Sequence, residues 1–194
     1  NQTYKIIKQS PEDKVIKSKW VFKKKLNPDG SVARFKARLV AKGFLQKYGK
    51  DFHDTFAPVA KSKSIRLPLA IAGARGHKVF HDDATSAFLN GILKELVILE
   101  PPEGYQEQYE DSNISSTEFR WLLLKALYGL KQAPREWNEV LHNFLLEQGL
   151  IQSKREPCIY FKGHGDKQVL VGVYVDDLLT TGGDTTEVKR MRDA

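Results

Sequence analysis

Sulfur-containing residues are scarce in this chain of 194 residues, which has one cysteine and one methionine. The single cysteine, Cys158, excludes an internal disulfide and has no companion at the spacing of a metal site, so we expect a buried thiol. No stretch approaches roughly 18 apolar residues, and the first residues lack a charged-then-apolar leader. We therefore expect neither a membrane span nor a secretory signal, and an intracellular setting.

Histidine is also rare. Of the five histidines, His81 stands next to two candidate ligands, Asp82 and Asp83, and we expect a structural role for it. Hydrophobic residues make up 41% of the chain, which is enough to bury a core. No internal repeat, low-complexity tract or flexible linker is visible. The composition predicts one domain with two lobes.

Acidic residues are few in the first part of the chain. Residues 1–50 contain 14 Lys or Arg against 3 Asp or Glu, whereas residues 101–150 contain 4 against 8. The formal net charge of +7 is therefore unevenly placed. A solvated lysine-rich surface is the usual explanation of such a run, but the clustering is typical of proteins that bind nucleic acid or triphosphates.

Two adjacent carboxylates, Asp176 and Asp177, follow the apolar run 169–175. A second apolar run and then Gly182 and Gly183 come after them, so we expect a β-hairpin with the acids at its tip. Two carboxylates about 4 Å apart repel by roughly 4 kcal/mol at an effective dielectric near 20, and a cation would offset that repulsion. Oxygen ligands favour magnesium or manganese. The alternative is an ordinary solvated turn, where Asp is common.

A second hairpin is predicted from residues 20–25 and 34–42, joined by a Pro-Asp-Gly turn within 26–31. In its second strand, Arg34, Lys36 and Arg38 alternate with apolar residues and so share one face. Such a row of cations is a plausible clamp for phosphates. An exposed strand kept soluble by its charge explains the same pattern equally well.

The next segment predicts a helix with Ser64 as its N-cap, ending at Gly73 or Gly76. Pro68 removes a backbone donor inside it, so we expect a kink or a later start. A short strand over 78–83 then ends in acids and gives a second candidate metal site. A compact turn is expected over 86–91.

Strands are expected at 96–99 and 119–127, with a polar surface excursion through residue 116 between them. Pro134 fits the first turn of a helix that stops at Gly149. Asp184 and Glu187 form the pattern of a capping box for a last helix. The apolar stripe of the helix after Pro134 has the i, i+3, i+4, i+7, i+8 spacing of a core-facing surface, and it consists of Trp137, Val140, Leu141, Phe144 and Leu145.

Eight blocks, in this order, resemble the reverse transcriptase of copia-type long-terminal-repeat retrotransposons over nearly the whole chain. Any one block is a weak signal, but eight in order are highly specific. The blocks are Trp20-Val21-Phe22-Lys23, Asn27-Pro28-Asp29-Gly30-Ser31, residues 36–44, Phe56-Ala57-Pro58-Val59-Ala60, Ala87-Phe88-Leu89-Asn90-Gly91, Pro102-Glu103-Gly104, residues 127–135 and Tyr174-Val175-Asp176-Asp177.

The resemblance implies an α+β fold, a right-hand polymerase made of fingers and palm. The fingers would comprise approximately residues 1–58 and 92–132, and the palm approximately 59–91 and 133–194. The palm would be a small antiparallel sheet backed by helices. The resemblance also implies that the thumb, the connection and the ribonuclease H region lie beyond this chain.

The resemblance further implies a catalytic site in which Asp83, Asp176 and Asp177 hold two Mg²⁺ ions, with Mn²⁺ as a substitute. Asp82 would be a neighbour and not a ligand. The incoming dNTP would contact Lys36, Arg38 and Lys42 from the fingers, Phe88 as the aromatic gate against a ribose 2′-hydroxyl, and Tyr128 with Gly129 in the nucleotide pocket. Lys131 and Tyr174 would contact template and primer.

The implied function is RNA- and DNA-templated DNA synthesis in retrotransposon replication. Its partners would be an RNA template, a DNA primer or template, dNTPs and the remainder of the Pol polyprotein, including thumb, ribonuclease H and integrase. No membrane is implied, and the setting would be a cytoplasmic virus-like particle or the nucleus. Two alternatives stay open: a catalytically silent remnant that binds RNA or DNA, and a two-metal nuclease or phosphatase.

Overall fold

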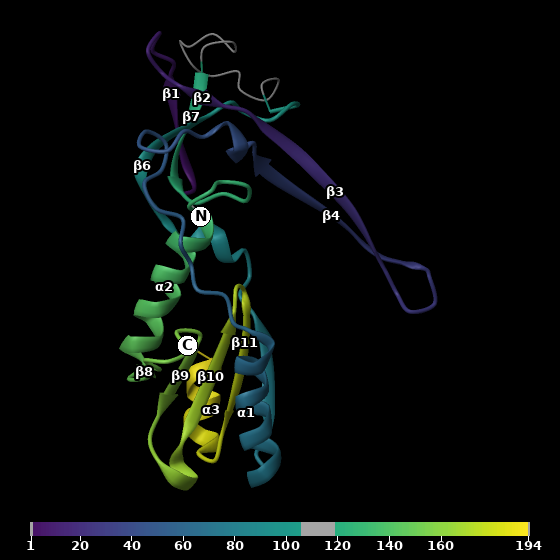
Figure 1. Cartoon of the computed structure of the whole chain (residues 1–194). Coiled ribbons are helices and arrows are strands. Elements are labelled where there is room, and N and C mark those ends of the chain that lie inside the picture. The colour runs from purple at the N-terminus through teal and green to yellow at the C-terminus, as the bar shows by residue number, and fades with distance from the viewer. Residues whose placement is uncertain (1, 106–118, 194) are drawn as a thin grey trace. The chain divides into compact units, whose positions relative to one another are not determined.

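A computed structural model describes residues 2–105 and 119–193 (Figure 1). The chain divides into two compact units, one of Asn1–Phe56 and Phe88–Trp137 and the other of Ala57–Ala87 and Asn138–Ala194. Helices occur together with several sheets, which confirms the predicted α+β class. The polar excursion expected through residue 116 falls largely outside the described residues. Within the described ranges, no helix is both long and apolar enough to cross a membrane.

The first unit contains a four-stranded sheet in the order β1-β7-β6-β2. These strands are Tyr4–Lys8, Phe119–Lys125, Ile92–Leu99 and Val15–Ile16 respectively. Alternate side chains of β7 are buried, as the period of a strand requires. Trp121 stacks on Tyr4 with ring centroids 3.9 Å apart and packs into the core of this unit. Both strands predicted here are present, although β6 begins earlier than expected.

The same unit carries a long hairpin of β3, Ser18–Leu26, and β4, Val32–Ala41, which forms a two-stranded sheet of its own (Figure 1). Its turn is closed by the side chain of Asp29, whose Oδ1 accepts hydrogen bonds from the backbone N–H and the hydroxyl of Ser31. Gly30 has a φ of 84°, which glycine adopts without strain. The predicted hairpin and its turn are confirmed.

The second unit contains a five-stranded sheet in the order β5-β11-β10-β9-β8, with every neighbouring pair antiparallel. The strands are Val79–Asp83, Asp177–Gly182, Val169–Tyr174, Ile159–Lys162 and Ile151–Gln152. Strand β10 is central and almost fully buried. The hairpin predicted around the adjacent acids is therefore confirmed as β10 and β11.

Helix α1, Ser62–Arg75, packs on this sheet. A Cβ atom placed on Gly172 would lie 3.6 Å from Ile65 Cδ1 and 3.7 Å from Pro68 Cγ, so these two side chains cover the centre of β10. The helix continues through the buried Pro68, and the predicted later start is wrong because burial of the proline ring holds this turn in place. Ser64 is not the N-cap: Lys61 is, and the Ser64 hydroxyl donates to the Glu156 carboxylate.

Helices α2, Ala133–Glu147, and α3, Thr185–Arg192, agree with the sequence. Trp137, Leu141 and Leu145 of the predicted α2 stripe are buried. Asp184 caps α3 by accepting a hydrogen bond from the Glu187 backbone N–H at 3.0 Å. Within the described residues, short 3₁₀ helices lie at Gly43–Leu45, Ala87–Asn90 and Gly165–Lys167, and the second of these is the compact turn expected over 86–91. Cys158 is buried, as predicted.

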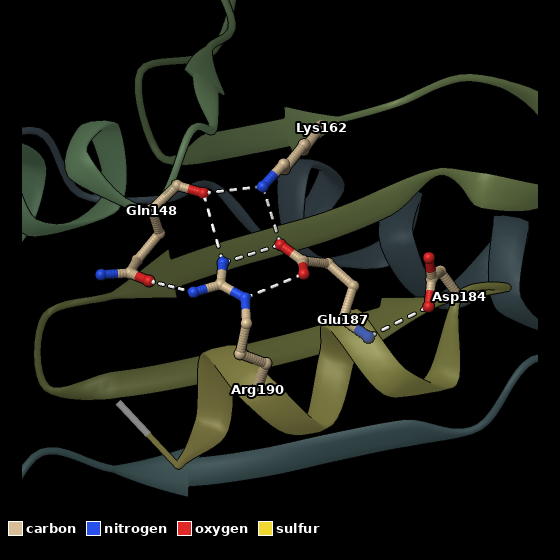
Figure 2. A network of polar contacts seen from close by, with 5 residues as sticks. All are labelled: Gln148, Lys162, Asp184, Glu187 and Arg190. Carbon is tan, nitrogen blue, oxygen red and sulfur yellow. Dashed lines mark hydrogen bonds and ion pairs between the residues drawn. The ribbon is translucent and has the colours of Figure 1, made fainter.

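A polar network joins α3 to the neighbouring chain segments (Figure 2). The Glu187 carboxylate accepts hydrogen bonds from Arg190, at 2.7 and 2.9 Å, and from Lys162 Nζ at 2.8 Å. Both cations also donate hydrogen bonds to Gln148, which follows the last residue of α2. Glu187 therefore uses its side chain for this network and completes only half of a capping box. Hydrogen bonds from Arg190 and then Lys162 lower the pKa of Glu187 to about 2.

This network predicts that the thermal stability of the fold depends on pH. Because the folded-state pKa of Glu187 lies below its ordinary value of 4.5, its contribution is complete above that value and is lost as the pH falls toward about 2. We expect Glu187→Gln to lower the thermal midpoint at pH 7, and the difference from the parent to shrink between pH 4.5 and pH 2. Thermal unfolding followed by circular dichroism at several pH values measures this. A difference that stays constant with pH would contradict the role given to the carboxylate.

Candidate active site

The turn between β10 and β11 presents the adjacent acids. Tyr174 pairs with Asp177, and Val175 and Asp176 form the two-residue turn between them. Val175 has a φ of 57°, a region that β-branched residues avoid. Such a conformation costs about 1–3 kcal/mol and persists only where surrounding structure holds it. The sheet therefore holds the acid-bearing turn in a conformation that its own sequence disfavours.

Asp83, the last residue of β5, lies directly opposite Asp177 in the β5–β11 register. Residues directly opposite in an antiparallel pair share a face, with Cβ atoms about 5 Å apart. The backbone N–H of Ala84 donates to the carbonyl of Asp176 at 2.8 Å, which joins the next residue to the turn. The fold thus brings the three predicted acids, distant in sequence, to one end of the same sheet.

His81 lies on the same face, two residues before Asp83, and its Nε2 is 2.7 Å from Asp177 Oδ1. The His81 side chain is 66% exposed and that of Asp177 is 44% exposed. Exposed pairs of this kind contribute little to stability. We expected a structural role for His81, whereas it contacts a candidate metal ligand, so a cation at Asp177 would compete with it.

Asp82 projects from the opposite face of β5 and is bound by α3. Arg192 donates two hydrogen bonds to its carboxylate, at 2.8 and 2.7 Å, and the guanidinium lies 4.2 Å from the centre of the Phe80 ring. The hydrogen bond from Arg192 lowers the pKa of Asp82. Asp82 therefore neutralises Arg192 on the α3 side of the sheet, away from the face that carries Asp83.

A double-mutant cycle tests this link between α3 and β5. We expect Asp82→Asn and Arg192→Gln to lower the thermal midpoint by similar amounts, and the double variant to be no less stable than either single variant, because all three remove the same ion pair. Thermal unfolding at low salt is the measurement. Fully additive effects would show that the two side chains act independently.

A cavity of about 800 Å³ adjoins Asp177 within the second unit. Its apolar wall comes from α1 and the sheet, and it is also lined by Asp177 and by Tyr174, which is 48% exposed. Two cations, Lys61 and Arg66, also line it. The remaining lining residues are Val59, Ala60, Ser62, Ile65, His81, Gly172 and Leu179. The face that carries the acids is therefore hollowed and open to a ligand.

Three of the residues predicted to bind the dNTP are in contact in the first unit. The rings of Phe88 and Tyr128 have centroids 4.7 Å apart, and the Arg38 guanidinium lies 5.6 Å from the centre of the Tyr128 ring. Lys36 precedes Arg38 by two residues on β4 and so shares its face. These contacts assemble an aromatic wall next to a cationic strand.

Backbone packing holds the segment of Tyr128 and Gly129 against the end of β4. The Ala41 N–H donates to the Tyr128 carbonyl at 2.8 Å. A Cβ atom on Gly43 would lie 1.9 Å from the Gly129 carbonyl oxygen, and one on Gly129 would lie 2.2 Å from the Ala41 carbonyl oxygen. Only glycine fits at either position, because no side-chain atom has room there.

A buried amide pair, which no sequence pattern predicted, supports this segment. Gln46 and Gln132 are buried, and Gln46 donates to Gln132 at 2.9 Å. Gln46 also accepts a hydrogen bond from the backbone N–H of Lys131 at 2.8 Å. The Lys131 ammonium lies 4.8 Å from the centre of the Phe52 ring. Lys131, predicted to contact the template, is thus positioned by residues far from it in sequence.

The donor set at the acids suits a hard divalent cation. Among residues 2–105 and 119–193, no group of three or more His, Cys, Asp or Glu residues is arranged as a metal site. Magnesium, however, is usually held by one or two carboxylates together with water and substrate phosphates. Asp83 and Asp177, opposite each other on one face, meet that requirement, with Asp176 in the adjoining turn.

Sequence comparison decides the family. The profile of the family described as "Reverse transcriptase (RNA-dependent DNA polymerase)" matches residues 1–194. The chain belongs to this reverse transcriptase family. The resemblance drawn from the eight sequence blocks is therefore confirmed, and the α+β fold described above is compatible with a reverse transcriptase domain.

Three relatives with curated descriptions are plant transposon polyproteins. The chain is 38% identical, over 100% of its length, to the retrovirus-related Pol polyprotein from transposon RE2 of Arabidopsis thaliana, and 40% identical, over 96%, to that from transposon RE1 of the same plant. It is 38% identical, over 99%, to the Pol polyprotein from transposon TNT 1-94 of Nicotiana tabacum. This reverse transcriptase chain spans only 12 to 14% of the length of these three relatives.

Proposed function

We propose that this chain performs DNA synthesis templated by RNA or DNA, transferring nucleotides from dNTPs to a primer 3′-hydroxyl with Mg²⁺. The observation that carries the proposal is the register that sets Asp83 opposite Asp177, with Asp176 in the turn beside them. Membership of the reverse transcriptase family supports the same reaction. The proposal makes Asp83, Asp176 and Asp177 the groups that hold the divalent ions.

Each of these residues has a defined task in the proposed reaction. Divalent ions bound there would stabilise the charge that develops on the attacking and leaving oxygens. To bind a divalent ion through the oxygen that contacts His81, Asp177 must give up that contact. Asp83 and Asp176 need no such exchange among the contacts described. The part of the three carboxylates is to bind and orient the ions.

The nucleotide-binding residues act by charge and shape. Lys36 and Arg38 would bind the triphosphate and neutralise the charge that spreads over the transferred phosphoryl group. Phe88, held against Tyr128, would crowd a ribose 2′-hydroxyl and so favour deoxynucleotides. Tyr128 and Gly129 would line the nucleotide pocket. Lys131 and Tyr174 would contact the template and the primer.

In this proposal the first unit corresponds to the fingers and the second to the palm of a right-hand polymerase. The partners are an RNA template, a DNA primer or template, and dNTPs. The remainder of a Pol polyprotein would supply the thumb, ribonuclease H and integrase, since the relatives are polyproteins much longer than this chain. A virus-like particle in the cytoplasm is the expected setting.

A second candidate function is binding without catalysis. One observation favours it: His81 occupies an oxygen of Asp177, which a catalytic ion would need. In that case the basic hairpin would hold RNA or DNA and the acids would be silent. A two-metal nuclease is a weaker candidate, because it leaves the contact of Phe88, Tyr128 and Arg38 without a purpose.

Primer extension tests the proposed function. The chain is incubated with a labelled DNA primer annealed to an RNA template or a DNA template of the same sequence, with dNTPs and with or without Mg²⁺. We expect extension on both templates only when the ion is present. Binding of the primer-template without extension, in Mg²⁺ and in Mn²⁺, would establish the binding-only function. Shortened template in place of extended primer would establish a nuclease.

A further inference from the structure

The β3–β4 hairpin has two faces of opposite character. Cross-strand pairing places side chains of alternate residues together, so each face is defined by the register. The basic face consists of Lys19, Lys23, Lys25, Arg34, Lys36 and Arg38, with Val21 and Val40. The aromatic face consists of Trp20, Phe22, Lys24, Leu26, Phe35, Ala37 and Leu39.

The rings of the aromatic face lie open to solvent. Phe22 is 76% exposed and Phe35 is 74% exposed, while Trp20, nearer the base of the hairpin, is 42% exposed. Trp20 and Phe22 are nearly parallel, with ring centroids 6.3 Å apart and an interplanar angle of 21°. A contiguous row of exposed rings often marks an interaction site. The aromatic face is therefore a candidate binding surface, and its dimensions and charge bear on the occupant.

The dimensions of the face argue against a protein as that occupant. Two strands of about nine residues give a surface roughly 10 Å wide and 30 Å long, or about 300 Å². A stable protein interface buries about 800 Å² on each partner. The aromatic face is thus too narrow for a second copy of the chain or for another folded protein, but it is wide enough for a single extended polymer strand.

The charge of the hairpin identifies the polymer. Neither strand contains an acidic residue, and seven Lys or Arg side chains lie on the two strands. Lys23 faces Lys36 and Lys25 faces Arg34 across the strands. Like charges directly opposite each other are destabilising, so a polyanion that neutralises them stabilises the hairpin. A two-stranded hairpin is itself only marginally stable in water, which increases this dependence.

We propose that the aromatic face is a stacking platform for the bases of unpaired nucleic acid, whose phosphates are attracted by the cations of the same hairpin. Bases in a duplex have their ring faces covered by neighbouring base pairs, whereas unpaired bases can stack on aromatic side chains irrespective of sequence. Phe22 and Phe35 are the principal stacking residues, and Lys24, opposite Phe35, supplies a phosphate contact on the same face. The proposal rests on the proposed function, since it assigns the site of a single-stranded template.

Binding of unpaired and paired oligonucleotides by the 194-residue chain tests the platform without metal or dNTP. Fluorescence anisotropy is measured with a labelled single-stranded 12-nucleotide oligo(U) and with a 12-base-pair RNA–DNA duplex, at several salt concentrations. For Phe22→Ala with Phe35→Ala, we expect affinity for oligo(U) to fall by about tenfold or more, with the salt dependence unchanged. Affinity for the duplex should change by less than about twofold.

Two further variants separate stacking from other roles. Phe22→Leu with Phe35→Leu keeps an apolar, strand-compatible face without the ring, and we expect it to bind oligo(U) as weakly as the alanine pair. The matched control on the basic face is Lys23→Ala with Lys36→Ala. This variant should bind both oligo(U) and the duplex more weakly than the parent. It should also reduce the slope of log K against log salt for oligo(U) by about 1.4, because two phosphate contacts are lost.

Several results would overturn the platform. If the leucine pair binds oligo(U) like the parent, the face acts as an apolar contact and not by stacking. If the alanine pair binds oligo(U) like the parent, nothing stacks there. A parent dimer in sedimentation that the alanine pair converts to monomer would assign the face to a second copy. None of these results affects primer extension by the parent chain. Failure of the stacking proposal can therefore be distinguished from failure of the proposed polymerase function.

Discussion

Substituting Asp176 or Asp83 by asparagine is expected to abolish primer extension, lowering its rate by about a thousandfold or more. Each change keeps the size of the side chain but removes one negative charge and one strong oxygen ligand from the end of the sheet where β5 meets the β10–β11 turn. Asp177→Asn should have the same direction of effect and also weaken the contact with His81. The measurement is single-turnover extension of a labelled primer at saturating Mg²⁺.

A matched substitution checks that the loss is specific. Asp166→Asn makes the same chemical change in the exposed 3₁₀ segment Gly165–Lys167 and should extend primer at the parent rate. Anisotropy should show that all of the variants bind the primer-template as the parent does. Parent-like extension by the Asp83 or Asp176 variant would refute the assignment of these acids as the catalytic groups.

Introducing a single methyl group at Gly43 is expected to unfold or severely destabilise the first unit, at a cost of about 3 kcal/mol or more. The new Cβ would lie 1.9 Å from the Gly129 carbonyl oxygen, and both sides of that contact are backbone. Relief requires β4 and the Tyr128–Gly129 segment to separate, which breaks the hydrogen bond from Ala41 N–H to the Tyr128 carbonyl. Urea unfolding followed by tryptophan fluorescence measures the change.

Gly73→Ala is the matched control for that experiment. Gly73 lies within α1, and nothing stands within 4 Å of its added Cβ. Because alanine favours the helix over glycine by up to about 1 kcal/mol, this variant should be as stable as the parent or more so. If Gly43→Ala unfolds at the same urea concentration as the parent, the backbone packing described for Gly43 and Gly129 is wrong.

Local patterns in the sequence were sufficient for most elements of the fold. The Pro-Asp-Gly turn predicted β3 and β4, the 3.6-residue stripe after Pro134 predicted α2, and Asp184 predicted the start of α3. Each of these signals acts over a few residues, so it survives in any tertiary context. The start of α1 was missed because the hydroxyl of Ser64 donates to Glu156, a residue far along the chain, instead of capping the helix.

Contacts between distant residues could not be predicted from local patterns. Neither the pairing of Asp82 with Arg192 nor that of Gln46 with Gln132 follows any sequence spacing, because both depend on how sheets and helices pack. The placement of Asp83 opposite Asp177 was expected from the family resemblance alone. The assignment of the two units to fingers and palm, and the roles of the individual site residues, stay predictions.

The chemical state of Cys158 makes the chain well suited to site-directed labelling. Burial raises the pKa of this thiol to about 11, so at pH 7.5 fewer than about one molecule in a thousand carries the reactive thiolate. A cysteine introduced at the exposed residue Ala33, next to the turn of the β3–β4 hairpin, would react with a maleimide dye far faster than the native one. A fluorophore placed there would report on the hairpin in the otherwise unaltered chain.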